Sequence, residues 1–291
     1  MKLVSFSVEG RSGIGALNAG GEVIDLAADP SLPSSMAEFI ALGASGLDRA
    51  AAVAGNGASA VEDVRIEAPI RPRNNVMAIG KNYHAHAKEF ADSGFDTSST
   101  AVTPENPIVF TKALSSIIAP GDGISLSSDP SGTTDYEGEL GVVIGRGGTK
   151  ISKANAMDHV YGYVVINDVT AREVQRQHVQ FFVGKSGVTF CPMGPAIVTA
   201  DEIADVEALQ VQTRVNGDLR QDQPIADLIF DIPTIIEAIS ASVLLEPGDV
   251  IATGTPSGVG IGFDPPLFLA EGDEVEVHIE GVGTLTNPVV A

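Results

Sequence analysis

Two stretches, DYEGELGVVIG at residues 135–145 and VYGYVVIND at residues 160–168, decide the fold class of this chain. In each, a short apolar run rich in β-branched residues ends at Gly, Asn or Asp, which is typical of a buried strand. Five further runs of this kind lie at residues 74–80, 106–112, 208–217, 248–254 and 272–281. We therefore predict a chain in which strands far outnumber helices.

Helical patterns occur in two places, YHAHAKEFA at residues 83–91 and DIPTIIEAISASVLL at residues 231–245. Pro233 is compatible with the second helix because proline is tolerated in the first turn. Strands and helices do not alternate regularly, as they would in a doubly wound parallel sheet. The pattern favours a mixed, β-rich α+β architecture with peripheral helices.

The N-terminal part has a character of its own. Residues 2–8 alternate in polarity, and the Gly-rich stretch at residues 10–26 indicates hairpins. Ser35, with Glu38 three residues later, predicts a capping box at the start of a helix.

Two prolines, Pro69 and Pro72, then favour an extended connector. We predict a small N-terminal α+β domain at residues 1–69 and a larger domain at residues 70–291.

The composition excludes several classes of protein. Of the 291 residues, 44% are hydrophobic and 19% are charged, which is enough apolar material for a core. The net charge of −21 repels phosphate backbones and anionic lipids, so neither nucleic acid nor membrane is an expected partner. Cys191, the single cysteine, cannot form an intrachain disulfide, and we expect a cytoplasmic protein without a signal peptide.

Two glycine patterns resemble nucleotide motifs but fail on spacing. GKSG at residues 184–187 lacks the earlier glycine of a phosphate-binding loop, because position 179 is Val. Gly258, Gly260 and Gly262 are spaced by two and two, whereas a dinucleotide fingerprint needs two and three.

Three carboxylates indicate a metal site. Glu137 and Glu139 are two residues apart in a strand, so their side chains project to the same side. Asp168 ends the second apolar run, where a carboxylate is costly unless it is paired or coordinated. One interpretation is a solvated acidic pair; the other is a hard cation such as Mg²⁺, Mn²⁺ or Ca²⁺, for which oxygen ligands without cysteine are suited.

A possible acid–base pair precedes them. His86 and Glu89 are three residues apart, which places them on one face of a helix. The carboxylate would orient the imidazole and raise its basicity, which prepares it to deprotonate a water. An ordinary ion pair on a surface helix is the alternative.

Three polar residues near the second strand complete the candidate site. Lys185 follows two phenylalanines, so it either lies partly buried, where it would stabilise an oxyanion, or snorkels at the surface. Arg172 and Gln175 follow Asp168 closely and would either reach a substrate carboxylate or make structural hydrogen bonds. Cys191 is interpreted as a small buried residue and not as a nucleophile.

Seven motifs in this order resemble the fumarylacetoacetate hydrolase family. They are GKNYHAHAKE (80–89), PIVFTK (107–112), DYEGELGVVIG (135–145), GYVVINDVTAREVQ (162–175), FFVGKSGVTFCPMGP (181–195), LIFDIP (228–233) and GDVIATGTPSGVG (248–260). The resemblance extends from about residue 70 to the end of the chain. It implies a catalytic domain of rolled, mixed sheets that assembles as a homodimer.

The resemblance also implies roles for particular residues. The metal ligands of the family match Glu137, Glu139 and Asp168, and the dyad that activates water from a mobile lid matches His86 and Glu89. The catalytic lysine matches Lys185, and positions that contact substrate or shape the pocket match Tyr83, Lys112, Gln175 and Thr255. Larger members place an additional Asp ligand just before the lid tyrosine, where this chain has Lys81 and Asn82, so we expect three protein ligands.

The function that the resemblance implies is activation of a 2-oxo acid by a divalent cation, which is Mg²⁺, Mn²⁺ or Ca²⁺. We expect hydrolysis of an acylpyruvate-type diketo acid to pyruvate and a carboxylic acid. The alternatives are decarboxylation of an oxaloacetate-like acid, isomerisation of a 2-hydroxy-dienoate and a non-enzymatic metal-binding role. The polar segment at residues 93–107 is expected to carry the contacts that distinguish the substrates.

Overall fold

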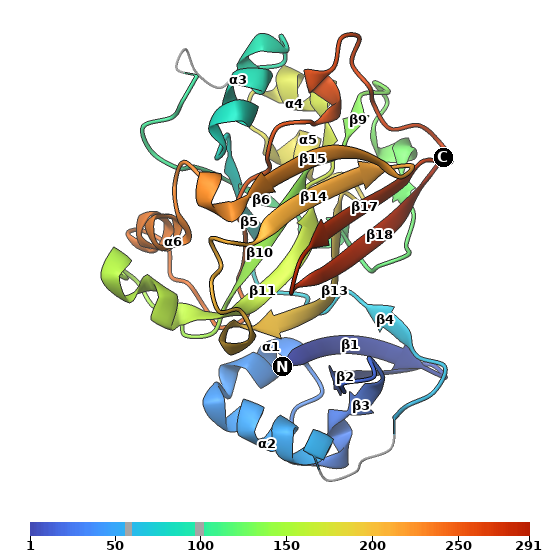
Figure 1. The fold of residues 1–291 in the computed structure, drawn as a ribbon, viewed down its shortest axis with the longest axis vertical. Coiled ribbons are helices and arrows are strands. Elements are labelled where there is room, and N and C mark those ends of the chain that lie inside the picture. Colours follow the sequence, from blue (N-terminus) through green and yellow to red (C-terminus); the bar gives the residue numbers. More distant parts are fainter. Residues whose placement is uncertain (56–59, 97–101) are drawn as a thin grey trace.

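The structure, a computed structural model, describes residues 1–55, 60–96 and 102–291. In these residues, eleven strands form one large mixed sheet (Figure 1). The main path of the sheet runs through β3 (Val23–Asp25), β2 (Arg11–Leu17), β1 (Lys2–Val8), β13 (Cys191–Thr199), β11 (Val160–Asn167), β10 (Gly138–Ile144), β16 (Val250–Ala252), β5 (Val76–Gly80) and β6 (Ile108–Lys112), with β4 (Arg65–Glu67) beside β1 and β7 (Ile117–Ile118) beside β13.

A second sheet of five strands packs against the first. Its order is β15 (Asp218–Pro224), β14 (Gln210–Val215), β17 (Glu274–Ile279), β18 (Gly283–Val290) and β8 (Ile124–Ser125), and a separate two-stranded sheet joins β12 (Thr170–Ala171) to β9 (Thr134–Asp135). Most neighbours are antiparallel, whereas three pairs among the described strands are parallel: β16 with β5, β13 with β7 and β18 with β8. The predicted mixed, β-rich α+β class is confirmed, and each of the seven predicted apolar runs contains a strand.

Alternation along the central strands gives the large sheet two buried faces. Val143, Val164 and Ile166 lie in a core shared with α1 (Met36–Ala41), α2 (Ala44–Gly55) and the N-terminal strands. Leu140, Val142 and Val165 lie in another core, which includes side chains of the second sheet and of α6 (Ile232–Ser240).

The N-terminal strands continue the large sheet directly. β1 pairs with β13 through Lys2 opposite Val198 and Leu3 opposite Ile197. Figure 1 shows this N-terminal part, in blue, at one end of the molecule. The hairpins form as predicted, but Ser35 makes no side-chain capping bond at the start of α1, so the capping box is wrong. The boundary near residue 70 stays a prediction.

The two helical patterns are present as α3 (His84–Asp92) and α6, and the helix predicted to begin after Ser35 is α1. Helix α6 ends at Ser240, five residues before the end of the predicted stretch. In the part of the chain that the structure describes, three α-helices were not predicted: α2, α4 (Arg172–His178) and α5 (Phe182–Lys185). Among the described residues, none of the helices has the length and apolar character needed to cross a membrane.

Candidate active site

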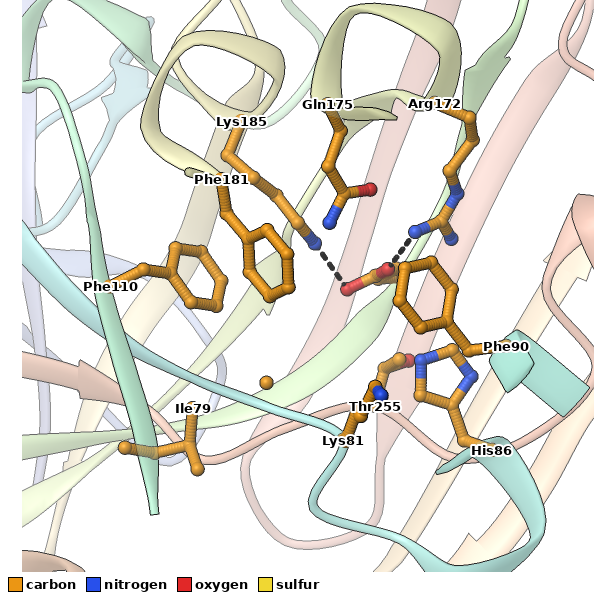
Figure 2. Close-up of a pocket in the computed structure, with 12 residues that line it drawn as sticks. Ile79, Lys81, His86, Phe90, Phe110, Arg172, Gln175, Phe181, Lys185 and Thr255 are labelled. Atoms are coloured by element: carbon orange, nitrogen blue, oxygen red, sulfur yellow. Dashed lines mark hydrogen bonds and ion pairs between the residues drawn. The ribbon is translucent and has the colours of Figure 1, made fainter. Parts of the chain in front are cut away.

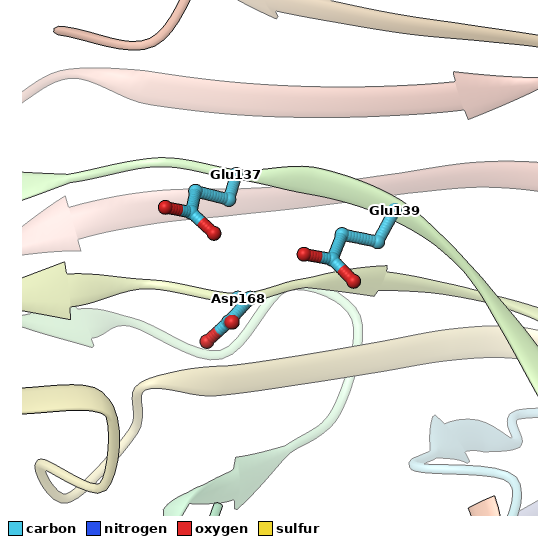
Figure 3. A group of neighbouring side chains, drawn as sticks. All are labelled: Glu137, Glu139 and Asp168. Carbon is cyan, nitrogen blue, oxygen red and sulfur yellow. The ribbon is translucent and has the colours of Figure 1, made fainter. Parts of the chain in front are cut away.

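The pairing of β10 with β11 brings the three predicted metal ligands together. Glu139 lies opposite Ile166 in this antiparallel ladder. The backbone N–H of Asp168 donates to the carbonyl of Glu137 (2.8 Å), so these two residues are also opposite each other. Glu137, Glu139 and Asp168 therefore project to one side of the sheet, as Figure 3 shows. All three are buried, and each offers an oxygen within 4.8 Å of the others.

Three buried cations surround these carboxylates. Lys185 Nζ donates to Glu137 Oε2 (2.7 Å) and to Asp168 Oδ2 (2.9 Å). Lys112 Nζ contacts Asp168 Oδ1 from another side. Arg172 Nη1 lies 2.6 Å from Glu137 Oε1, while its Nε donates to Asp135 Oδ2 (2.8 Å).

The surroundings of the two glutamates shift their pKa values in opposite directions. Burial alone would raise the pKa of Glu137, but the charges of Lys185 and Arg172 overcome it and lower that pKa to about 2. Burial raises the pKa of Glu139 well above its ordinary value, and repulsion from Asp168 and Glu137 adds to the effect. The backbone N–H of Gly254 donates to Glu139 Oε2 (2.8 Å).

This arrangement fits a hard divalent cation. The three converging groups are all carboxylates, which is the donor set that Mg²⁺, Mn²⁺ and Ca²⁺ prefer. A cation would relieve the repulsion that raises the pKa of Glu139. The expected set of three protein ligands, Glu137, Glu139 and Asp168, is the set that the geometry brings together.

The predicted acid–base pair lies on α3. His86 Nδ1 is 3.1 Å from Glu89 Oε2, and the backbone N–H of Gly258 donates to Glu89 Oε1 (2.9 Å). His86 is buried although its helix lies at the surface, and its ring stacks near that of Phe90 (6.2 Å between centroids). The interpretation as a solvated surface ion pair therefore does not apply.

His86 shares one cavity with the carboxylate site. Figure 2 shows His86 and Phe90 on one side of this cavity, and Lys185, Gln175 and Arg172 across from them. The cavity is lined by Ile79, Gly80, Lys81, His86, Phe90, Phe110, Glu137, Arg172, Gln175, Phe181, Lys185 and Thr255. It therefore brings His86 of the acid–base pair and Glu137 of the carboxylate cluster together between aromatic walls.

Three of the expected substrate-contacting residues line the cavity. Arg172 Nη2 and Gln175 Oε1 are buried polar atoms without a hydrogen-bond partner in the described protein, so both are available to a ligand. Thr255 Oγ1 instead donates to the carbonyl of Gly138 (3.0 Å) and accepts from Gln221 Nε2 (2.7 Å).

Two other expected contact residues do not line this cavity. Lys112 lies beneath the carboxylates, where its ammonium contacts Asp168 and the carbonyls of Val169 and Lys185. Tyr83 is fully buried, and it lines a separate pocket beside Gln223. Their direct contact with substrate stays a prediction.

Several residues at the site were missed from sequence. Lys81 lines the cavity with a left-handed backbone (φ 55°), and its ammonium pairs with Asp96. Asp135 is fully buried beneath Arg172, and Phe110 lies under Lys185 Nζ (5.2 Å to the ring centroid). Asp135 could have been found from sequence, because it stands at the same two-residue spacing as Glu137 and Glu139 in DYEGE.

Two further expectations concern nearby segments. Residues 97–101, within the predicted substrate-distinguishing segment 93–107, lie outside the described residues. Cys191 is fully buried, and burial raises the pKa of its thiol to about 12, as expected for an inert cysteine.

Comparison with known proteins agrees with this geometry. The family model described as fumarylacetoacetate (FAA) hydrolase C-terminal matches residues 75–290. The chain belongs to the fumarylacetoacetate hydrolase family. It is 49% identical over 230 residues to oxaloacetate tautomerase YisK of Bacillus subtilis, covering 79% of this chain and 74% of that protein.

Solved structures of the family extend the likeness to the whole chain. A fumarylacetoacetate hydrolase from Exiguobacterium antarcticum is 43% identical with a TM-score of 0.85, covering 100% of this chain and 99% of the other. Maleylpyruvate hydrolase from Sphingobium sp. SYK-6, in complex with manganese(II) and pyruvate, is 30% identical with a TM-score of 0.79 and the same coverage. These relatives include a tautomerase and hydrolases, so membership identifies an enzyme family and leaves the reaction to be proposed.

Proposed function

We propose that this enzyme uses a divalent cation to act on a short 2-oxo dicarboxylate, and that its reaction is the keto–enol tautomerisation of oxaloacetate. The observation that carries the proposal is that Glu137 of the carboxylate cluster and His86 of the acid–base pair line the same cavity. The 49% identity to an oxaloacetate tautomerase supports this choice of reaction. The acylpyruvate hydrolysis expected from sequence becomes the second candidate.

The residues of the chain account for the proton transfers. A cation held by Glu137, Glu139 and Asp168 would polarise the 2-oxo carbonyl of the substrate. We assign the Nδ1 proton of His86 to its bond with Glu89, because an ionised carboxylate only accepts. Nε2 is then the free base that takes a proton from carbon 3. The electron pair of that C–H bond forms the C2–C3 double bond. His86 then returns the proton from Nε2 to the former carbonyl oxygen, which gives the enol and regenerates the neutral imidazole.

The cationic lining supports a substrate with two carboxylates. Arg172 Nη2 offers an unused donor at one end of the cavity. Lys81 lies in the same lining with its ammonium paired to Asp96. A second carboxylate on the substrate would be attracted to the free donor of the Arg172 guanidinium in a cavity with aromatic walls.

Acylpyruvate hydrolysis is the second candidate function. The same His86–Glu89 pair is suited to deprotonating a water that attacks the distal carbonyl. Lys185 would stabilise the oxyanion that forms. The solved maleylpyruvate hydrolase with manganese and pyruvate supports this alternative. Decarboxylation of oxaloacetate and isomerisation of a 2-hydroxy-dienoate would use the same carboxylate cluster and Lys185. Both reactions are further outcomes of the test.

The test compares both reactions in one preparation with added Mn²⁺. Tautomerisation is followed by the decay of enol absorbance of oxaloacetate and by deuterium exchange at carbon 3. Hydrolysis is followed by pyruvate and carboxylic acid released from an acylpyruvate. We expect Mn²⁺-dependent tautomerisation of oxaloacetate at a rate above that of Mn²⁺ without protein. If oxaloacetate is not tautomerised and the acylpyruvate yields pyruvate and carboxylic acid in equal amounts, the enzyme is the hydrolase of the second candidate.

A matched pair of variants tests the base. His86→Ala should lower the rate at least about 100-fold, as expected for loss of an acid–base group. His84→Ala, an exposed position on the same helix, should leave the rate unchanged. Full activity of His86→Ala would exclude the proposed base. The homodimer and the location in the cytoplasm stay predictions.

A further inference from the structure

The loop that contains Gly258, Gly260 and Gly262 has a role unrelated to nucleotide binding. The backbone N–H of Gly258 donates to Glu89 Oε1 (2.9 Å). The N–H of Gly260 donates to Asp135 Oδ1 (2.6 Å), and the N–H of Ile261 donates to Asp135 Oδ2 (3.2 Å). One short segment of backbone therefore holds two carboxylates that come from different parts of the chain.

A side chain at either of two glycines in this loop would overlap neighbouring atoms. A Cβ on Gly262 would overlap Glu89 Oε1, and a Cβ on Gly260 would overlap the carbonyl oxygen of Leu267 and lie 2.6 Å from Asp135 Oδ1. Gly258 has a φ of +103°, which side chains rarely adopt. The loop is further held by Tyr136, whose hydroxyl donates to the carbonyl of Gly258 (2.9 Å).

Asp135 connects this loop to the carboxylate cluster. It is fully buried, and Arg172 Nε donates to its Oδ2 (2.8 Å). Arg172 Nη1 lies 2.6 Å from Glu137 Oε1. A continuous series of short polar contacts thus runs from Glu89 through the loop and Asp135 to Arg172 and Glu137.

We propose that Asp135 is a positioning residue that couples the His86–Glu89 pair on α3 to the carboxylate cluster through the loop at residues 258–262. The Asp135 side chain forms no hydrogen bond with His86 or with the three carboxylates of the cluster; its partners among the described residues are Arg172 and backbone N–H groups. Its Oδ1 accepts from the N–H of Gly260, and its Oδ2 accepts from both the N–H of Ile261 and Arg172 Nε, so a shift of Asp135 moves the loop that holds Glu89. Two experiments test this coupling. The measurement of kcat rests on the proposed role of His86, whereas the measurement of backbone hydrogen exchange rests only on the contacts described above.

The first experiment measures hydrogen exchange on the full chain without metal or substrate. Asp135→Asn keeps the size of the side chain but sets an amide donor against the N–H groups of Arg172 and Ile261. We expect faster deuterium uptake in peptides covering residues 84–92 and 258–262. Asp249→Asn is the control, since Asp249 is also buried and accepts from the N–H of Glu246 (2.8 Å) at the start of β16.

A second variant reaches the same contact without touching Asp135. Gly262→Ala should displace Glu89 directly and raise uptake in residues 84–92, while leaving the Asp135–Arg172 pair in place. Gly55→Ala, where a Cβ meets nothing within 4 Å, controls for the added methyl group.

The kinetic experiment asks whether Asp135 acts through Glu89. We expect Asp135→Asn and Gly262→Ala each to lower kcat at least about tenfold, with a smaller effect on KM. Combining Asp135→Asn with Glu89→Gln should give no greater loss than Glu89→Gln alone, because both changes remove one coupled function.

Two results would overturn the proposal. One is unchanged uptake in residues 84–92 in Asp135→Asn, whatever happens to its melting temperature. The other is multiplication of the kcat losses in the double variant, which would make Asp135 and Glu89 independent. If no turnover is found on any 2-oxo acid, the proposed function fails, and the exchange experiment still decides the coupling.

Discussion

Lys112 shows how a buried charge is held at this site. Its side chain is fully buried, and its ammonium contacts Asp168 Oδ1 and the carbonyls of Val169 and Lys185. All three N–H groups therefore have acceptors within the protein. This surrounding favours a structural role, because a substrate would have to displace an existing partner.

Replacing Lys112 by Met should therefore affect stability before it affects substrate affinity. The change leaves Asp168 with one fewer buried cation, and breaking a buried pair in this way costs about 3–5 kcal/mol in the free energy of unfolding. Urea denaturation measures this loss. Lys88→Met, at an exposed pair on α3, is the control and should change little. A stable Lys112→Met with only a raised KM would instead favour direct contact with substrate.

At the scale of elements, α6 shows how a polar residue sets a helix boundary. Asp231 Oδ1 accepts from the backbone N–H of Thr234 (2.8 Å), and Pro233 lies in the first turn. Lys153 Nζ lies 2.8 Å from Asp231 Oδ2. Partial burial works against ionisation of Asp231, but the hydrogen bonds from Lys153 and Thr234 outweigh it and lower its pKa.

Replacing Asp231 by Ala should cost about 1 kcal/mol of stability near neutral pH, as is usual for the loss of an N-cap. Because the folded pKa is lowered, this contribution is fully present above the unfolded pKa of about 3.9 and is lost as the pH falls through the folded value. The difference between the native protein and Asp231→Ala should therefore shrink in urea titrations below about pH 4. Asp218→Ala, at a highly exposed aspartate, serves as the control, and a pH-independent difference would contradict this account.

The strands and helices that could be predicted from sequence are those with a strong hydrophobic pattern. Strands such as β10 and β11 are continuous apolar runs buried on both faces, and they were found from sequence. Helix α4, by contrast, has the polar sequence REVQRQH, and only Arg172 and Gln175 are buried. A short helix of this kind offers no apolar periodicity, because tertiary contacts and not propensity stabilise it.

At the scale of the molecule, the N-terminal part and the larger part share one sheet. β1 adds to the edge of β13, and the N-terminus donates to the side chain of Glu202 (2.7 Å). Side chains of α1 and of β13, including Phe39 and Ile197, lie in the same apolar core. The predicted boundary near residue 70 therefore separates two parts that bury surface against each other.

Removing residues 1–69 should destabilise the remainder. The deletion would expose the edge of β13 and the apolar side chains of Met193 and Ile197, which favours aggregation. We expect a lower melting temperature and a larger apparent mass in light scattering than for the full chain. Adding residues 1–69 as a separate fragment should partly restore both values. A monodisperse 70–291 fragment with an unchanged melting temperature would show that the larger part folds independently.

The sequence by itself determined the strand-rich class, the same-side placement of Glu137 and Glu139, and the His86–Glu89 pair. Each of these follows from periodicity within a few residues of chain. Only the tertiary structure decided that Asp168 lies opposite Glu137 and that Asp135 and Glu89 meet at one loop. These contacts join segments far apart in the chain, and burial of both sheet faces selects the strand register that creates them.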